Sequence, residues 1–232
     1  MTVAENPKLE KSVLKGISCI AVPVEVFVPQ NGEPVVTTYS VSMDAAIRWE
    51  DRFKGDLLSF EAIDCLKREF ATIAENIGYR YFESENEFML EYDLSPDMHV
   101  TNCPEEIKVH KISSNAVLSR LCEASGCDIE IADDGEDVLF AVVEDGKLSA
   151  YAGMNDVTYE DGSVEISVET APDSRRKGFG MACVTALSNY LLGKGVTVRY
   201  KCSKENAASS ALAEKCGFRL NGKRFSFVCE KI

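Results

Sequence analysis

The sequence predicts an α+β fold arranged as two units, and three observations lead to this prediction. Strand-like stretches of alternating or β-branched residues are spread along the whole chain of 232 residues. Two amphipathic helix patterns lie in the first half, and in the second half turn signals separate three successive strands. With 45% hydrophobic and 27% charged residues, the chain can bury a sizeable core.

The first half is predicted to be a mixed α/β unit. Asn31-Gly32 is a turn signal between two β-rich stretches, which indicates a hairpin. Two stretches with apolar residues at spacings of three and four then predict helices. The expected strands lie at residues 17–28, 35–41, 79–82 and 87–92, and the expected helices at 43–53 and 60–77.

A linker is expected at residues 94–105, where Pro96, Asn102 and Pro104 interrupt any periodicity. It divides the chain into an N-terminal domain, residues 1–104, and a C-terminal domain, residues 105–232. The second domain begins with a strand, a helix and an acidic stretch, and continues as a three-stranded meander with turns at Asp145-Gly146 and Asp161-Gly162. These elements lie at residues 107–112, 115–123, 128–137, 138–143, 148–152 and 164–170.

The net charge of −13 argues against nucleic acid and anionic membrane as partners, because both are bound by Lys and Arg. The charge is uneven. Residues 173–232 hold twelve Lys or Arg and four Asp or Glu, a balance of +8 that leaves −21 on residues 1–172. The basic segment predicts either a site for a small polyanion or simply a solvated face. The longest apolar run, residues 17–28, is too short to span a bilayer, so we expect a cytoplasmic protein.

Nine cysteines are an odd number in a chain long enough to fold without disulfides, so reduced thiols are expected. Cys122 and Cys127 are the closest pair and have no histidine nearby, so no metal site is predicted. Neither His99 nor His110 lies near a recognisable nucleophile, and we assign them no role.

The segment 164–195 joins a strand, a tight basic loop and an amphipathic helix. The loop reads Arg175-Arg176-Lys177-Gly178-Phe179-Gly180, and the helix after it ends at Gly193 and Gly195. Unpaired amides and the positive end of the helix dipole favour an anion at such a helix start. Three adjacent cations would repel one another in an empty turn, which indicates that this loop binds phosphate.

This segment resembles the GNAT superfamily of acyl-CoA-dependent N-acyltransferases, whose signature is Arg or Gln, two residues, Gly, one residue, and Gly or Ala. Arg175, Gly178 and Gly180 match it. A strand at residues 196–202 and a helix that starts at Asn206 and ends in Gly217-Phe218 look like the family's next two elements. The resemblance covers about residues 105–232.

The resemblance implies a mostly antiparallel central sheet, flanked by helices, that splays between its fourth and fifth strands to hold acetyl-CoA. Pantetheine would pair with the end of strand 164–170, and the loop amides would hold the pyrophosphate. Asn206 bonds to the cofactor, caps its helix, or does both. The residues implied in cofactor binding are Val168, Thr170, Arg175, Arg176, Lys177, Gly178, Phe179, Gly180, Met181, Asn206 and Ser209.

Catalysis requires a neutral amine and therefore a base near the thioester. Glu165 and Glu169 share one face of strand 164–170, and either could serve. We favour Glu165, which lies where many family members carry a base, although exposed sheet faces also collect glutamates without purpose. The family often has a tyrosine at the position of Ala213, so Tyr200 or water would protonate the thiolate, or it would leave unassisted.

The function expected from these features is acetyl transfer from acetyl-CoA to a primary amine by direct attack, with a small-molecule acceptor favoured. The acidic stretch 128–137 either steers a cationic amine or is only a solvated surface. Two alternatives remain: a non-catalytic module that binds acyl-CoA, suggested by Ala213, and a scaffold whose first half binds a protein partner.

Overall fold

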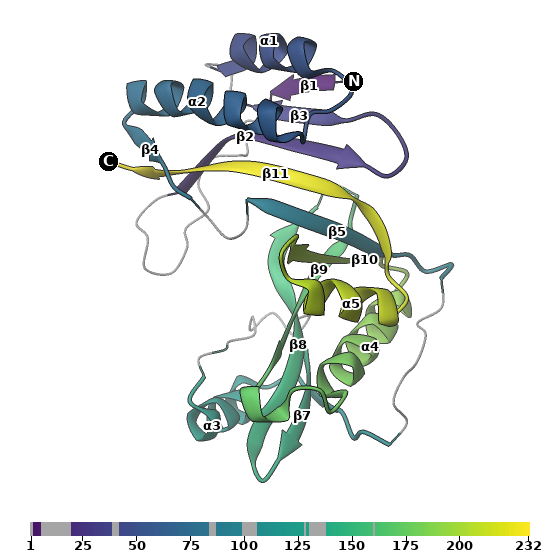
Figure 1. Ribbon diagram of the computed structural model, residues 1–232. Coiled ribbons are helices and arrows are strands. Elements are labelled where there is room, and N and C mark those ends of the chain that lie inside the picture. Colours follow the sequence, from purple (N-terminus) through teal and green to yellow (C-terminus); the bar gives the residue numbers. More distant parts are fainter. Residues whose placement is uncertain are drawn as a thin grey trace. The chain divides into compact units, whose positions relative to one another are not determined.

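The computed structural model describes residues 2–5, 20–38, 42–83, 87–98, 106–127, 129, 138–159 and 161–232. The chain forms two compact units, and each combines strands with helices (Figure 1). The first unit comprises Met1–Glu91, Cys202–Glu205 and Asn221–Ile232, and the second comprises Tyr92–Lys201 and Asn206–Leu220. The predicted domain boundary between residues 104 and 105 lies outside the described residues and stays a prediction, as does any role of the acidic stretch, which is described only at Ile129.

The strands of the first unit pair in the order β1-β3-β2-β11, with β4 also paired to β11. β1 and β3 run parallel, whereas the pairs β2–β3, β2–β11 and β4–β11 are antiparallel. The strands are β1 (Thr2–Glu5), β2 (Ile20–Pro29), β3 (Val35–Thr38), β4 (Tyr79–Tyr81) and β11 (Arg219–Lys231). A further strand, β5 (Phe88–Leu94), has residues in both units. The hairpin predicted around Asn31-Gly32 is therefore confirmed for the described residues.

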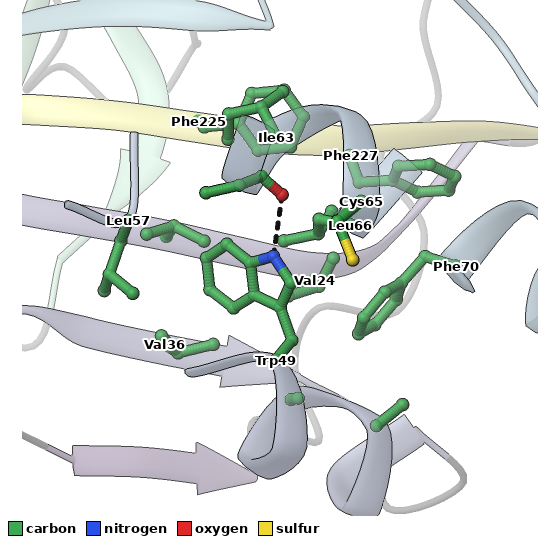
Figure 2. Packing of buried hydrophobic residues seen from close by; sticks show 14 of the residues in the cluster. Val24, Val36, Trp49, Leu57, Ile63, Cys65, Leu66, Phe70, Phe225 and Phe227 are labelled. Carbon is green, nitrogen blue, oxygen red and sulfur yellow. Dashed lines mark hydrogen bonds between the residues drawn. The ribbon is translucent and has the colours of Figure 1, made fainter. Parts of the chain in front are cut away.

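Helices α1 (Met43–Phe53) and α2 (Phe60–Asn76) bury their apolar stripes in the core of the first unit. Their bounds match the predicted helices because the apolar spacing and the cap agree: the Ser59 side chain accepts from the Ala62 N–H at 3.3 Å. Figure 2 shows Trp49 at the centre of this core, where its indole Nε1 donates to the Ala62 carbonyl at 2.7 Å.

Two strands of the first unit were not predicted from the sequence. β1 precedes the first predicted strand, and β11 follows the last predicted helix. The alternation in β11 is visible once it is sought, because Phe225, Phe227 and Cys229 are fully buried while the residues between them are not.

The strands of the second unit pair in the order β6-β7-β8-β9-β10. All these pairs are antiparallel except β9–β10, so the predicted mixed, mostly antiparallel fold with flanking helices is confirmed. The elements are β6 (His110–Ile112), α3 (Asn115–Ser125), β7 (Leu139–Glu144), β8 (Lys147–Thr158), β9 (Val164–Thr170), the 3-10 turn Pro172–Ser174, α4 (Phe179–Leu192), β10 (Val198–Ser203) and α5 (Ala207–Lys215). None of the helices in the described ranges is both long and apolar enough to cross a bilayer.

Helices α3 and α4 cover opposite faces of this sheet. On one face, Leu118 of α3 packs with Leu139 of β7 in a buried cluster. On the other face, the ring of Phe140 lies 5.7 Å from that of Tyr190 in α4. Successive strand residues point to opposite faces, so the faces of the residues in β7 and β9, and of residues 150–154 in β8, follow from this alternation. Tyr190 of α4 is only half-buried, and the ammonium groups of Lys111 and Lys194 lie 4.1 and 4.5 Å from the centroid of its ring.

Candidate active site

Strands β9 and β10 run parallel but pair over only three residues each. The pairing joins 164–166 of β9 to 198–200 of β10, and no pair joins the rest of β9 to β10 although both strands are fully described. The remainder of β9, residues 167–170, keeps its antiparallel pairing with β8 on the other edge. The two strands therefore part after Ile166, as the family resemblance implied.

The backbone of β9 presents hydrogen-bonding groups at the edge that β10 leaves. The Val164 N–H donates to the Thr197 carbonyl, just before β10, at 3.0 Å. The Ala171 N–H donates to the Ser149 carbonyl of β8, on the opposite edge, also at 3.0 Å. Because backbone groups alternate between the two edges of a strand, Val168 and Thr170 direct their N–H and C=O groups toward the open edge. An extended ligand could pair with them as an additional strand does.

A cavity of about 790 Å³ lies where the strands part, which is within the range of small-molecule sites. Most of the predicted site residues line it, and they come from four elements and the basic loop. They are Val168, Glu169 and Thr170 of β9, Arg175, Arg176, Gly178, Phe179, Gly180 and Met181 of the loop and α4, and Tyr200, Asn206 and Ser209 of β10 and α5. Two predicted residues, Glu165 and Lys177, are not part of the lining.

The basic loop leads into α4 with a backbone conformation that leaves amide groups available at the start of this helix. Arg176 and Gly178 have positive φ values of 63° and 84°, a conformation that makes concave sets of N–H groups. Gly178 is the N-cap of α4 and supplies no side-chain acceptor, so the first amides of the helix have no cap partner. Arg175 is oriented by Nε, which donates to the Thr170 carbonyl at 3.5 Å. Free amides at a helix start are a geometry that favours an anion.

Gly180 allows the first turn of α4 to lie directly against β9. A Cβ atom at this position would lie 2.8 Å from Thr170 Oγ1 and 3.6 Å from Val168 Cγ2. The glycine in the predicted signature therefore has a packing reason in this chain: it brings the helix start, with its amides, up to the edge of the strand.

Lys177 does not line the cavity. Its ammonium lies 3.8 Å from a Glu144 carboxylate oxygen and 5.6 Å from the centroid of the Phe179 ring. Glu144 ends β7 and also accepts from Ser149 Oγ at 2.9 Å. The sequence indicated three cations for one anion, but a tertiary partner holds the third.

Helix α5 closes the cavity with its first two turns. Asn206 is its N-cap, with the side-chain oxygen accepting from the Ser209 N–H at 3.0 Å, so the capping role is present whether or not the amide also meets a ligand. The hydroxyls of Tyr200 and Ser209 lie 2.7 Å apart at the cavity wall. Ala213 is fully buried and is not in the lining.

Glu165 is enclosed by partners on the α3 side of the sheet. Its carboxylate accepts from Asn155 Nδ2 at 2.8 Å and from the Tyr159 hydroxyl, and it lies 3.2 Å from the Lys201 ammonium. Its side chain is 13% exposed. Burial, together with the hydrogen bond to Glu165, raises the pKa of Tyr159, so this phenol stays a donor at neutral pH.

Glu169 lies on the same face and lines the cavity. Its Oε2 accepts from the hydroxyl of Tyr151, the residue directly opposite on β8, at 2.5 Å. Of the two predicted carboxylates, the structure thus places Glu169 in the cavity wall and Glu165 in a network beside it.

Several residues around the cavity were not predicted. Lys215 and three apolar positions of α5 line it, and their spacing of three and four residues could have revealed them once Asn206 marked the helix start. Tyr151 could have been found only from the register of β8 against β9. A register shift between Met154 and Thr158 makes counting from the turn unreliable there.

A family model for the acetyltransferase (GNAT) family matches residues 108–218. These residues form a GNAT acetyltransferase domain. Every residue that lines the cavity falls within the matched range. The match ends before β11 and does not include residues 1–107, which belong largely to the first unit.

The chain is also similar to solved structures. A putative GNAT acetyltransferase from Novosphingobium aromaticivorans DSM 12444 is 20% identical with a TM-score of 0.52, over 67% of this chain and 68% of that chain. A GCN5-related N-acetyltransferase-like protein from Streptococcus suis 89/1591 is 18% identical with a TM-score of 0.45, over 85% of this chain and 70% of that chain. No curated protein sequence matches the chain. At 20% identity the first likeness supports the GNAT fold alone.

Proposed function

We propose that this protein transfers the acetyl group of acetyl-CoA to a primary amine of a small molecule. The observation that carries the proposal is the cavity at the parting of β9 and β10, which has an open strand edge on one side and an anion-binding helix start on the other. One molecule that requires both features is a diphosphate with an extended amide-containing arm, as in coenzyme A.

The chain's residues fit such a ligand. The amides after Gly178, with Arg175 and Arg176 beside them, would hold the diphosphate through charge-assisted hydrogen bonds. The backbone of Val168 and Thr170 would pair with the pantetheine amides. Because Gly180 has no side chain, the diphosphate and this strand edge can be reached by one continuous ligand.

In the proposed reaction, the amine nitrogen attacks the thioester carbonyl, a C–N bond forms and the C–S bond breaks. The amine must first lose a proton, and Glu165 and Glu169 are the candidate acceptors, directly or through water. The departing thiolate needs a proton, which the Tyr200 hydroxyl beside Ser209 can donate from the cavity wall. The products are an N-acetylated amine and free coenzyme A.

Calorimetric titration with acetyl-CoA tests the cofactor site. We expect binding by the natural protein and at least a tenfold loss, about 1.4 kcal/mol, in Arg175→Glu, because the reversed charge faces the diphosphate. Arg120→Glu makes the same charge change at an exposed position of α3 and should bind normally. Equal affinity of both variants would contradict the proposed cofactor site.

Thiol release against a panel of amines then tests turnover. Glu165→Gln should leave acetyl-CoA affinity intact and lower the rate most strongly below neutral pH, where fewer amine molecules are already deprotonated. An unchanged rate would remove Glu165 from the mechanism.

The alternative function, acyl-CoA binding without transfer, is favoured by one observation. Position 213, where the resemblance implies a tyrosine acid, is a fully buried alanine outside the cavity lining. This alternative predicts acetyl-CoA binding with no thiol release for any amine, so the two experiments together separate it from the transferase.

A further inference from the structure

Two tyrosine–glutamate pairs lie along the α3-side face of β9. In the first, the Tyr159 hydroxyl donates to Glu165, and in the second the Tyr151 hydroxyl donates to Glu169 at 2.5 Å. The two glutamates are four residues apart on one strand and therefore point to the same face. The pairs have the same chemical groups but different surroundings.

The first pair is filled by an ammonium group of the protein itself. Lys201 Nζ lies 3.2 Å from the Glu165 carboxylate and 5.0 Å from the centroid of the Tyr159 ring. A carboxylate and the face of an aromatic ring both attract a cation, the first by its charge and the second by its quadrupole. This pair is an internal example of how a tyrosine and a glutamate of this sheet hold an alkylammonium.

The second pair opens onto the cavity instead. Glu169 is exposed and lines the cavity wall, whereas the Glu165 side chain is 13% exposed. Among the residues that the structure describes, no Lys or Arg forms an ion pair with Glu169. The residues of the second unit that lie outside the described ranges are 99–105, 128, 130–137 and 160. Their sequence includes neither Lys nor Arg.

The tyrosine of the second pair, Tyr151, is held in place by contacts within the protein. Tyr151 packs against the buried cluster that α3 forms with β7 and β8, which includes Leu118 and Leu148. Burial, and secondarily the hydrogen bond to Glu169, raises the pKa of Tyr151, so the phenol remains a donor to the carboxylate. A carboxylate accepts several hydrogen bonds, so the one from Tyr151 leaves capacity for a cation.

The positive and negative side chains that line the cavity come from different elements. Its lining contains the cations Arg175, Arg176 and Lys215 on the loop and α5, and Glu169 is its carboxylate. A polyanion in this cavity would be drawn to the cations of the loop and α5, and a cation to Glu169 of β9.

We propose that Tyr151 and Glu169 form a binding subsite for an aliphatic ammonium group of the acceptor. That the bound ammonium belongs to the acetyl acceptor rests on the proposed function. The subsite itself is defined by cation binding alone. Tyr151 acts as a positioning residue that orients Glu169, and Glu169 selects cationic amines over neutral ones.

A quaternary ammonium ion tests this subsite separately from any proton transfer, since it has no proton to give. Choline and 3,3-dimethyl-1-butanol have nearly the same shape but differ in charge, and their binding to the full-length protein can be compared by NMR titration with coenzyme A present and absent. We expect choline to bind at least tenfold more tightly than the neutral alcohol. In Glu169→Gln this preference should disappear, and in Tyr151→Phe, which keeps the ring, it should fall by about threefold.

Glu214→Gln is the matched control, because it removes the same charge from an exposed position of α5 outside the cavity lining. It should keep the preference for choline, and circular dichroism should show that all three variants are folded. Equal binding of choline and the alcohol by the natural protein, or a preference that survives in Glu169→Gln, would overturn the subsite. A different outcome is that acetyl-CoA does not bind while the protein still prefers choline in a way that depends on Glu169. That result would contradict the proposed function but support the ammonium subsite.

Discussion

At the scale of single residues, the close approach between Gly180 and Thr170 allows a test of whether the packing of α4 against β9 depends on this contact. Gly180→Ala would place a methyl group 2.8 Å from Thr170 Oγ1, closer than side chains tolerate. We expect a loss of about 1–3 kcal/mol in the free energy of unfolding, as for other overpacked sites. Weaker acetyl-CoA binding should accompany it, because the amides of the helix start would be displaced from the strand.

The double variant Gly180→Ala with Thr170→Ala provides the control. It removes the oxygen that the new methyl group would strike but keeps the backbone of residue 170. Urea denaturation of both single variants and the double variant should reveal a favourable coupling of more than about 0.5 kcal/mol. Additive losses would show that the helix start does not depend on this contact.

Individual side chains also show where inference from sequence stopped. The glycines and arginines of the loop could be predicted because their requirement is local: a turn, a helix start and an anion. The directions of Lys177 and Glu165 could not be predicted, because each is fixed by a distant partner, Glu144 for the first and Lys201 for the second. Charge count in a sequence does not reveal which charges neutralise one another.

At the scale of elements, α5 tests whether Asn206 caps, binds, or does both. Asn206→Ser keeps a capping oxygen but removes the amide donor. We expect its stability to stay within about 0.5 kcal/mol of the natural protein, whereas Asn206→Ala should lose about 1 kcal/mol. Calorimetry with acetyl-CoA should show weaker binding by both variants, because Asn206 lines the cavity. If Asn206→Ser binds normally, the residue is a cap and nothing more.

Most helices and strands could be predicted because local patterns agree with their surroundings. The bounds of α1 and β9 match the periodicity of their sequences. β8 extends to Thr158, six residues beyond the predicted strand, because its pairing resumes after a register shift that leaves no clear sequence signal. β11 was missed although its buried residues alternate, since a strand's partner, here β2, is not visible in its own sequence.

At the scale of the whole molecule, the chain returns to its first unit to complete it. Phe225, Phe227 and Cys229 of β11 are fully buried in the same cluster as Trp49 of α1. Trp49 is the single tryptophan of the chain, so its fluorescence reports the unfolding of this unit. Phe227→Ala should lower the free energy of unfolding seen by this probe by about 3–5 kcal/mol, through lost burial and the cavity left behind.

Val228→Ala is the matched control, because its side chain is only partly buried and points to the other face of β11. Its effect on the same fluorescence transition should be under about 1 kcal/mol. A Phe227→Ala midpoint equal to that of the natural protein would mean that β11 contributes little to the first unit.

The return of β11 to the first unit also has a consequence for synthesis. Strand β2 is made early and pairs with β11, which follows every other element in the sequence. A nascent chain therefore cannot finish its first unit until residue 231 has emerged from the ribosome. Until then the backbone groups of β2 that pair with β11 have no partner strand, and an incomplete sheet of this kind is prone to aggregation and to chaperone binding.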